Sequence, residues 1–388
     1  MVPITYNLRN LVERKTTTLL TALGIGLTVT VLVTALALTE GLRVLFAGSG
    51  DERQALVLRK GSNAELSSAV STEAYQIIRR LPGIAGADQG EPLVSPEGFV
   101  VANLPSSYSP DGINVSVRGM LPVGLKMRDI KVTTGAMFEP GRHQVAVGES
   151  IAARYPDAQP GKKIVFGKSA WEVVGIFHSN DQAANSEIWC DLNQLLGDYE
   201  RGGNGGSSSL LVRLESPAGF PAFKKTVEDD QRLGVNVQKE KEYYAAMTVS
   251  GAPLEVLGFA VAIIMAIGSA FAATNTMYAA VSRRSKEIGT LRALGFSRAS
   301  ILFSFITESV CLSLIGGVLG VLLALPMNGL ATGIGNFSTF TDVTFKFRIS
   351  PMAIFWGLTF AAMIGALGGF LPAYAASKKD IVQAMRDA

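Results

Sequence analysis

Charged residues are scarce in this chain. Asp, Glu, Lys and Arg make up only 17% of its 388 residues, whereas 48% of the residues are hydrophobic. Soluble globular domains typically contain about 25% charged residues. The shortage excludes an ordinary, fully soluble protein and indicates membrane-spanning segments.

Cysteine and histidine are also rare, with two of each. So few cysteines cannot form the disulfide framework of a small secreted domain. His143 and His178 have no cysteine or carboxylate partners at metal-ligand spacing, so we expect neither to bind a metal.

A phosphate-binding loop is missing as well. The segment Pro160-Gly161-Lys162 does not qualify, because no glycine stands five residues before Gly161. No set of residues suggests a catalytic nucleophile, base or metal centre. We therefore expect no catalytic site and no cofactor in this chain.

Long apolar runs are what the sequence does contain. Crossing about 30 Å of hydrocarbon takes roughly 18 to 20 apolar residues at 1.5 Å per residue. Four runs reach this length: Thr18–Leu38, Leu254–Ala280, Ile301–Leu325 and Met352–Leu371. The first exceeds the roughly 7 to 15 apolar residues of a signal peptide, so we expect it to remain as a membrane helix.

The basic residues predict how these helices are oriented, because short loops rich in Lys and Arg stay in the cytoplasm. They lie before the first run, between the second and third, and after the fourth: Arg9, Arg14, Lys15, Arg283, Arg284, Lys286, Arg292, Arg298, Lys378, Lys379 and Arg386. Both termini are therefore predicted to be cytoplasmic, with residues 47–250 outside. Cys190 would be external and Cys311 inside the third helix, so they cannot pair; the reactivity of Cys190 stays open.

The predicted fold is an α-helical membrane domain of four transmembrane helices plus an α+β extracytoplasmic domain. In that domain a split α/β subdomain carries an inserted β-rich subdomain, because strand-helix-strand patterns stand at both ends of the region. The expected boundaries are 1–17 (interfacial amphipathic helix), 18–46 (first span and stalk), 47–107 with 208–242 (split α/β subdomain), 108–207 (β-rich insertion), 243–281 (stalk and second span), 282–297 (short cytoplasmic helix), 298–325 (third span), 326–350 (short external loop), 351–371 (fourth span) and 372–388 (cytoplasmic tail).

The short segment between the second and third spans has the most specific pattern. Ile288, Leu291 and Leu294 recur at a spacing of three, which predicts a short amphipathic helix. Gly295 stands where a left-handed cap would end that helix, and Ser297 can cap the next one. We therefore expect a short helix held between two membrane helices on the cytoplasmic side.

This segment resembles the MacB/FtsX family of ABC permeases, which carry an Arg-x-x-Glu-Ile-Gly-x-x-Arg-Ala-Leu-Gly run after the second span. The run is matched by Arg284, Glu287, Ile288, Gly289, Arg292, Ala293, Leu294 and Gly295. Four further pieces are similar in the same order: residues 8–10 with 20–26, residues 141–177, Glu308 with Gly316, Gly317 and Gly320, and residues 372–377 with 384–386. The resemblance covers nearly the whole chain and implies a porter-like external subdomain.

The resemblance implies that the short helix couples the permease to a separate ABC ATPase subunit, which would bind the ATP and Mg. No nucleotide-binding domain is expected to be fused to this chain. The residues expected to contact the ATPase are Arg283, Arg284, Glu287, Ile288, Leu291, Arg292, Leu294 and Gly295. The alternative is that the arginines merely follow the positive-inside rule.

The implied function is that of an exporter permease in a bacterial inner membrane. It would convert ATP hydrolysis by the partner into periplasmic conformational work that expels or extracts a substrate. The family's substrates are macrolides, peptide toxins, glycolipids and outer-membrane lipoproteins. Partners implied are a second permease copy as a homodimer, membrane lipid and, in some members, a periplasmic adaptor and outer-membrane channel; nucleic acid is not expected. The alternative is an FtsX-like transmitter that activates a periplasmic partner.

Three residues of the third span need separate interpretation. An ionisable group inside a membrane helix is a functional candidate, but we expect Glu308 to pair with a nearby arginine or a helix end rather than to relay protons. Gly316 and Gly320 form a small-xxx-small pair that allows close helix packing. Packing within the chain is expected, and a dimer contact is the alternative.

Overall fold

The computed structural model describes residues 15–86, 90–105, 111–199, 206–247, 252–335 and 341–378. Two compact units make up the chain. The helical unit comprises Met1–Gly41, Gly251–Leu330 and Lys346–Ala388, and the sheet unit comprises Leu42–Ser250 and Ala331–Phe345. Most of the predicted interfacial helix 1–17 and of the tail 372–388 lies outside the described residues.

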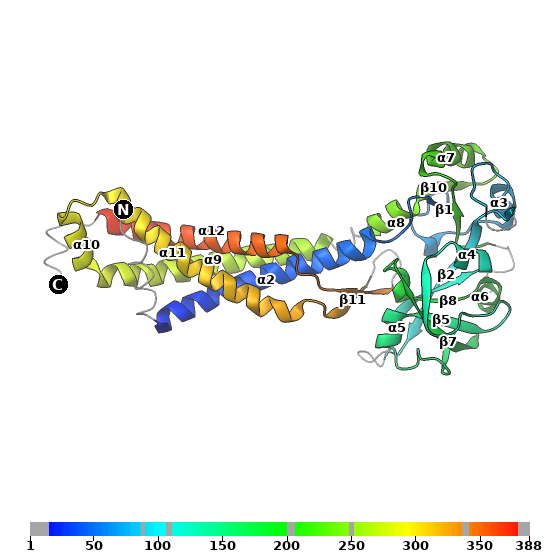
Figure 1. The fold of residues 1–388 in the computed structure, drawn as a ribbon, viewed down its shortest axis with the longest axis horizontal. Coiled ribbons are helices and arrows are strands. Elements are labelled where there is room, and N and C mark those ends of the chain that lie inside the picture. Colours follow the sequence, from blue (N-terminus) through cyan, green and yellow to red (C-terminus); the bar gives the residue numbers. More distant parts are fainter. Residues whose placement is uncertain are drawn as a thin grey trace. The chain divides into compact units, whose positions relative to one another are not determined.

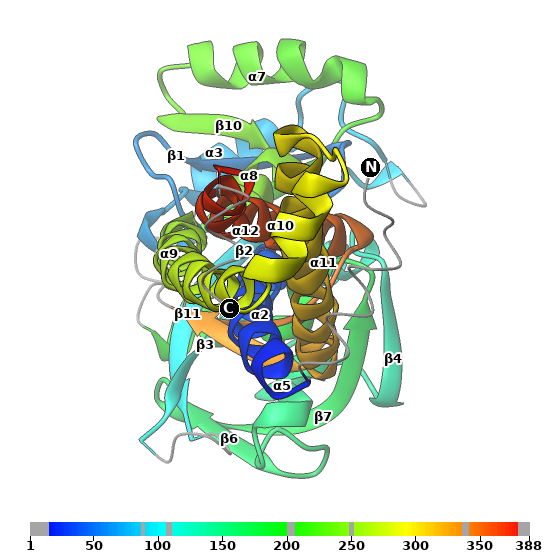
Figure 2. The same cartoon turned by 90° about the vertical axis from the view of Figure 1, so that its left-hand side faces the viewer.

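Long apolar helices form the helical unit. They are α2 (Lys15–Ala47, whose last residues enter the sheet unit), α9 (Ala252–Arg283), α11 (Arg298–Ala324) and α12 (Pro351–Lys378). In the described part of the chain, four helices are long and apolar enough to cross a membrane, which confirms the predicted number of spans. Figure 2 shows them nearly end on, with the short helix α10 (Ser285–Ala293) in front.

Small residues bring α11 onto α2. A Cβ atom at Gly316 would lie 2.6 Å from the carbonyl oxygen of Ala22, and one at Gly320 would collide with the carbonyl oxygen of Gly26. The Thr30 hydroxyl also donates to the carbonyl of Gly320 at 3.0 Å. Gly316 and Gly320 therefore allow α11 to pack closely on α2 within the chain.

Hydroxyl groups join the other helices of this unit. Ser309 on α11 donates to the carbonyl of Gly365 on α12 at 2.7 Å, and Thr274 on α9 donates to the carbonyl of Gly368 at 2.8 Å. Such bonds give small polar side chains a partner inside an apolar bundle. They fix α12 against both α9 and α11.

One sheet of ten strands forms the centre of the sheet unit, in the order β10-β1-β9-β2-β3-β8-β5-β7-β4, with β6 paired to β7. Its strands are β1 (Gln54–Arg59), β2 (Val94–Leu104), β3 (Ile113–Met120), β4 (Ile130–Gly135), β5 (Gln144–Gly148), β6 (Lys163–Phe166), β7 (Ser169–Ser179), β8 (Glu187–Asp191), β9 (Ser209–Arg213) and β10 (Val235–Lys239). Its short helices are α3 (Thr72–Ile78), α4 (Pro122–Lys126), α5 (Glu149–Arg154), α6 (Leu192–Asp198), α7 (Phe220–Asp229) and α8 (Glu240–Met247). The pairs β3–β8 and β5–β7 are parallel, and the other adjacent pairs are antiparallel. Figure 1 shows strands of this sheet together with its short helices.

Separate hydrophobic cores lie along this sheet. One is formed around β1, β9 and β10 with α3 and α7, and another around β3, β5, β7 and β8. Side chains alternate between the faces of a strand. On β3 this places Val115 and Val117 in the second core, whereas Met120 packs on the other face with Phe177 and Trp189. Arg118 shares the face of Met120, which puts a charge where apolar side chains gather.

The sheet runs unbroken across the predicted boundary between the α/β subdomain and the insertion, because β2 pairs with β9 on one side and β3 on the other. The sequence did not indicate β2, since Pro96 and Gly98 are unusual inside a central strand. Pro96 nevertheless sits in register with Leu210.

The predicted short loop 326–350 also contains structure that was not expected. It forms the strand pair β11 (Ala331–Gly335) and β12 (Asp342–Lys346). Arg154 donates to the hydroxyl of Thr344 at 2.7 Å, and the Thr344 amide donates to Ser186 at 3.2 Å. These bonds make this segment part of the sheet unit.

Candidate functional site

The short helix α10 has a well-defined end. Gly295 adopts φ +90°, its amide donates to the carbonyl of Arg292 at 3.1 Å, and the Phe296 amide donates to the carbonyl of Leu291 at 3.1 Å. This pair of bonds is a Schellman motif, which favours glycine at the left-handed position. Ser297 then accepts a hydrogen bond from the Ser300 amide and caps α11. Both predicted caps are confirmed.

A buried ion pair fixes the beginning of α10. The Arg284 guanidinium lies 2.9 Å from a carboxylate oxygen of Glu308 on α11, and each side chain is only 6% exposed. Opposite charges at this distance attract strongly where water is largely excluded. The pair therefore joins the start of α10 to the third span.

An apolar contact supports the same attachment. Ile288, four residues after Arg284, is 1% exposed and packs with Met277, Ile301 and Phe305. Residues four apart lie on the same face of a helix. One face of α10 is therefore held by charge and by packing against α9 and α11.

The predicted contact residues differ in exposure. Arg283, Glu287, Leu294 and Gly295 are exposed, Leu291 and Arg292 are half-buried, and Arg284 and Ile288 are buried. Leu294 is 72% exposed, which is unusual for so large an apolar side chain. Lys286 adds a further exposed positive charge.

Arg284 and Ile288, which the sequence predicts to contact the ATPase, point into the helical unit. The reason is the helical period, which places residues 284 and 288 on one face at α10 and turns residues 286 and 287 away from that face. Arg284 and Ile288 therefore position α10.

Metal binding and thiol chemistry in the sheet unit would depend on its acidic, histidine and cysteine side chains. Among the described residues, no group of three His, Cys, Asp or Glu side chains could hold a metal. Cys190 on β8 is fully buried, and burial raises the pKa of its thiol well above the usual range, with Asp191 adding to the effect. Its thiolate form is thus suppressed.

Comparison with known proteins agrees with this architecture. Residues 18–230, more than half of the chain, match the MacB-like periplasmic core domain, and residues 259–381 match the FtsX-like permease C-terminal family. The chain belongs to the MacB/FtsX-like permeases. It is a permease component of the ABC transporter type.

Several relatives of this permease are macrolide export ATP-binding/permease proteins MacB. The protein from Pasteurella multocida (strain Pm70) is 24% identical over 396 residues, and that from Agrobacterium fabrum (strain C58 / ATCC 33970) is 26% identical over 391 residues. Each alignment covers 96% of this chain but 58% of the relative. The permease therefore spans less than two thirds of the length of these relatives.

Two solved structures are similar to part of the permease. The periplasmic region of MacB from Actinobacillus actinomycetemcomitans is 13% identical, with a TM-score of 0.38, and the alignment covers 50% of this chain and 92% of that one. The extracellular domain of the noncanonic ABC-type transporter YknZ from Gram-positive bacteria is 14% identical, with a TM-score of 0.36. That alignment covers 48% of this chain and 100% of the YknZ domain.

The sequence of this MacB/FtsX-like permease predicts α10 but not how it is attached. A nearby arginine or a helix end was the expected partner of Glu308, and in the structure Arg284, 24 residues earlier, is the partner. No periodic pattern links residues so far apart. The available signal was the presence of one carboxylate inside an apolar span, which requires a partner of opposite charge.

Proposed function

We propose that this permease transmits the motion of a separate ABC ATPase subunit to its sheet unit, where that motion expels or extracts a substrate. In this proposal α10 is the coupling helix. The observation that carries it is the attachment of α10 by Arg284 and Glu308, 2.9 Å apart. A helix fixed in this way would move α11 when a partner moves it.

The exposed face of α10 supports an interface with another protein. Lys286 and Glu287 on α10 and Arg283 just before it offer charges for hydrogen bonds across an interface, and Leu294 at its end offers an apolar side chain. Charged residues around one apolar anchor are typical of a specific contact. ATP and Mg would then be bound by the partner.

The course of the chain supports transmission between the units. The chain passes from one unit to the other after Gly41, Ser250, Leu330 and Phe345. Each passage is a covalent connection through which a displacement can travel. We place residues 47–250 outside a bacterial inner membrane and both termini in the cytoplasm, because the short basic segments favour that orientation.

The assembly that we propose contains two permease copies and an ATPase. Macrolide export is the activity named for the relatives, and it gives macrolides as a first substrate class to test. Cargo displacement without activation of a periplasmic partner would support an exporter. Activation of such a partner without cargo displacement would favour the FtsX-like transmitter instead.

A double substitution tests the coupling helix. Glu287→Ala with Leu294→Ala removes a charge and the exposed apolar anchor, and it should abolish co-purification with the ATPase and stimulation of ATP hydrolysis by substrate. The matched control is Val165→Ala, which truncates a side chain of the sheet unit that is 68% exposed. Unchanged co-purification of the double variant would show that α10 does not bind the ATPase.

A further inference from the structure

Buried charges of unequal number lie on one face of the sheet unit. Among the described residues of this cluster, four carboxylates with side chains at most 8% exposed surround two guanidinium groups at most 6% exposed. The carboxylates are Glu65, Glu97, Glu187 and Glu240, and the guanidinium groups are Arg118 and Arg128. Two negative charges are therefore in excess where water is largely excluded. Holding a proton is the simplest way for such a site to reduce its charge.

The first three carboxylates are each compensated at short range. Glu65 accepts two bonds from Arg118, at 2.7 and 2.9 Å, and one from Ser209 at 2.6 Å. Glu187 accepts two bonds from Arg118, at 2.9 and 2.8 Å, and one from the Trp189 indole.

Glu97 stands between the two arginines. One of its oxygens accepts from Arg118 at 2.8 Å and from Arg128 at 2.7 Å. Both bonds are charge-assisted, and bonds of this kind are shorter and stronger than those between neutral groups.

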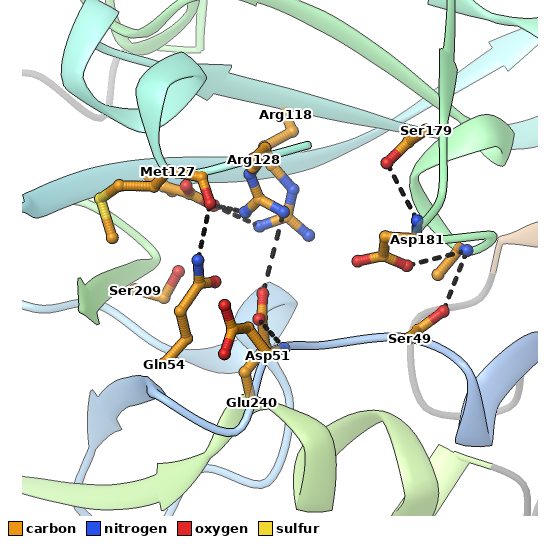
Figure 3. Close-up of polar contacts among 12 residues, drawn as sticks. Ser49, Asp51, Gln54, Arg118, Met127, Arg128, Ser179, Asp181, Ser209 and Glu240 are labelled. Carbon is orange, nitrogen blue, oxygen red and sulfur yellow. Dashed lines mark hydrogen bonds and ion pairs between the residues drawn. The ribbon is translucent and has the colours of Figure 1, made fainter. Parts of the chain in front are cut away.

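Glu240 is compensated least. Its nearest guanidinium nitrogen, on Arg128, is 3.8 Å away, which is beyond hydrogen-bond length. The bond that it does accept comes from the main-chain amide of Asp51, at 3.1 Å (Figure 3). The proton is therefore best placed on Glu240.

Glu240 also lies at a junction, by which we mean the contact between the segment after α2 and the start of α8. It is the first residue of α8, and Asp51 follows the end of α2 by four residues. Gly50, which lies between the end of α2 and Asp51, adopts φ +84°. A Cβ atom at Gly50 would lie 2.8 Å from the Lys241 amide nitrogen. The segment after α2 thus lies directly against the start of α8.

We propose that Glu240 is a proton-binding site whose protonated form closes the junction between Asp51 and α8, and whose ionised form opens it. A cavity of about 200 Å³ borders Glu240 and gives the carboxylate a route to water when the junction opens. The charged or titratable side chains that face this site from the surrounding elements are Asp51, Glu97, Arg118, Arg128, Asp129, Asp181, Arg213 and Tyr244.

The electrostatics of the junction agree with this assignment. Burial raises the pKa of Glu240 from its ordinary value of 4.5 to about 7, and nearby Asp181 and Glu97 raise it as well, against the lowering effects of Arg128 and the Asp51 amide. A carboxylate that gains solvent on opening returns toward its ordinary pKa. Opening is therefore linked to release of a proton. These residues all lie in the sheet unit, so the proposal does not depend on an ATPase partner.

Hydrogen exchange of the full-length permease tests the proposal. Amides of residues 49–54 and 240–244 are compared at pH 6 and pH 8, after correction for the intrinsic pH dependence of exchange. With pKa values of about 7 closed and 4.5 open, linkage predicts roughly tenfold more opening at pH 8 than at pH 6. Glu240→Gln should abolish this difference, because glutamine keeps an acceptor for the Asp51 amide but cannot ionise.

The matched control is Glu52→Gln. Glu52 pairs with Lys241 at 2.8 Å at the same junction, but its side chain is 66% exposed, so the pH response should persist in this variant. Equal opening of the native protein at both pH values would overturn the proposal, as would a pH response that survives Glu240→Gln. If Glu240→Gln does not fold, hydrogen exchange of the Glu52→Gln protein is measured at a series of pH values. Opening of the junction should rise with pH and level off above about pH 7. Opening that stays constant between about pH 6 and pH 8 would refute the proposal.

Discussion

Replacing Glu308 by glutamine isolates the contribution of the buried ion pair that holds α10. Glutamine keeps the size of the side chain but leaves the Arg284 guanidinium, 6% exposed, without its negative partner at 2.9 Å. Removing one member of a buried pair typically costs about 3 to 5 kcal/mol, because the remaining charge stays desolvated. We expect Glu308→Gln to lower the free energy of unfolding by an amount in this range.

A double-mutant cycle separates the pair from other effects. Arg284→Met should be similarly destabilising, whereas Arg284→Met with Glu308→Gln leaves no uncompensated charge. The double variant should therefore cost at least about 2 kcal/mol less than the two single costs added together. Lys286→Met is the matched control, since Lys286 is exposed, and it should change stability by less than about 0.5 kcal/mol.

Denaturant titration of the permease in micelles measures these stabilities, and ATP hydrolysis by the reconstituted complex measures coupling. We expect Glu308→Gln to weaken substrate stimulation of the ATPase as well as stability, because α10 would no longer be fixed to α11. If the destabilisation of the double variant equals the sum for the two single variants, with a coupling energy below about 0.5 kcal/mol, the ion pair does not hold α10 to α11.

Three further substitutions probe other parts of the molecule. Glu240→Gln should stabilise the protein by about 3 kcal/mol at pH 8 and have little effect at pH 4.5, because the native carboxyl, with its pKa raised from 4.5 to about 7, loses stability as the pH rises through that window. Gly316→Leu should cost about 1 to 3 kcal/mol, since even its Cβ atom would lie 2.6 Å from the Ala22 carbonyl oxygen. Gly295→Ala should cost about 1 kcal/mol through its φ of +90° alone and should weaken ATPase coupling.

Unfolding titrations check all three changes. Gly268→Ala is the control for the glycine variants, because a Cβ atom at Gly268 would meet no atom within 4 Å. Equal stability of native and Glu240→Gln proteins at pH 8 would contradict the raised pKa. A Gly316→Leu protein as stable as Gly268→Ala would contradict the close packing of α11 on α2. If Gly295→Ala weakens ATPase coupling without any loss of stability, Gly295 acts through contact with the partner and not through the cap of α10.

Much of the architecture could be predicted because it depends on local patterns. Uninterrupted apolar runs identify the membrane helices without knowledge of their neighbours, since their length must match the bilayer. The caps of α10 were also predictable, because a left-handed position favours Gly295 and a helix start favours Ser297. Strand β2 escaped prediction, because Pro96 and Gly98 interrupt its pattern while its pairing with β3 and β9 overrides that local signal.

By itself, the sequence determined the spans, the position of α10 and the family motif around it, because each depends on residues close together in the chain. The tertiary structure alone decided that Arg284 points inward to Glu308 and that Glu240 lies beside Asp51, with Arg128 3.8 Å away. Those partners are 24, 189 and 112 positions apart in the numbered chain. Their charges are meaningful only after folding removes water, and burial is a property of the packed structure.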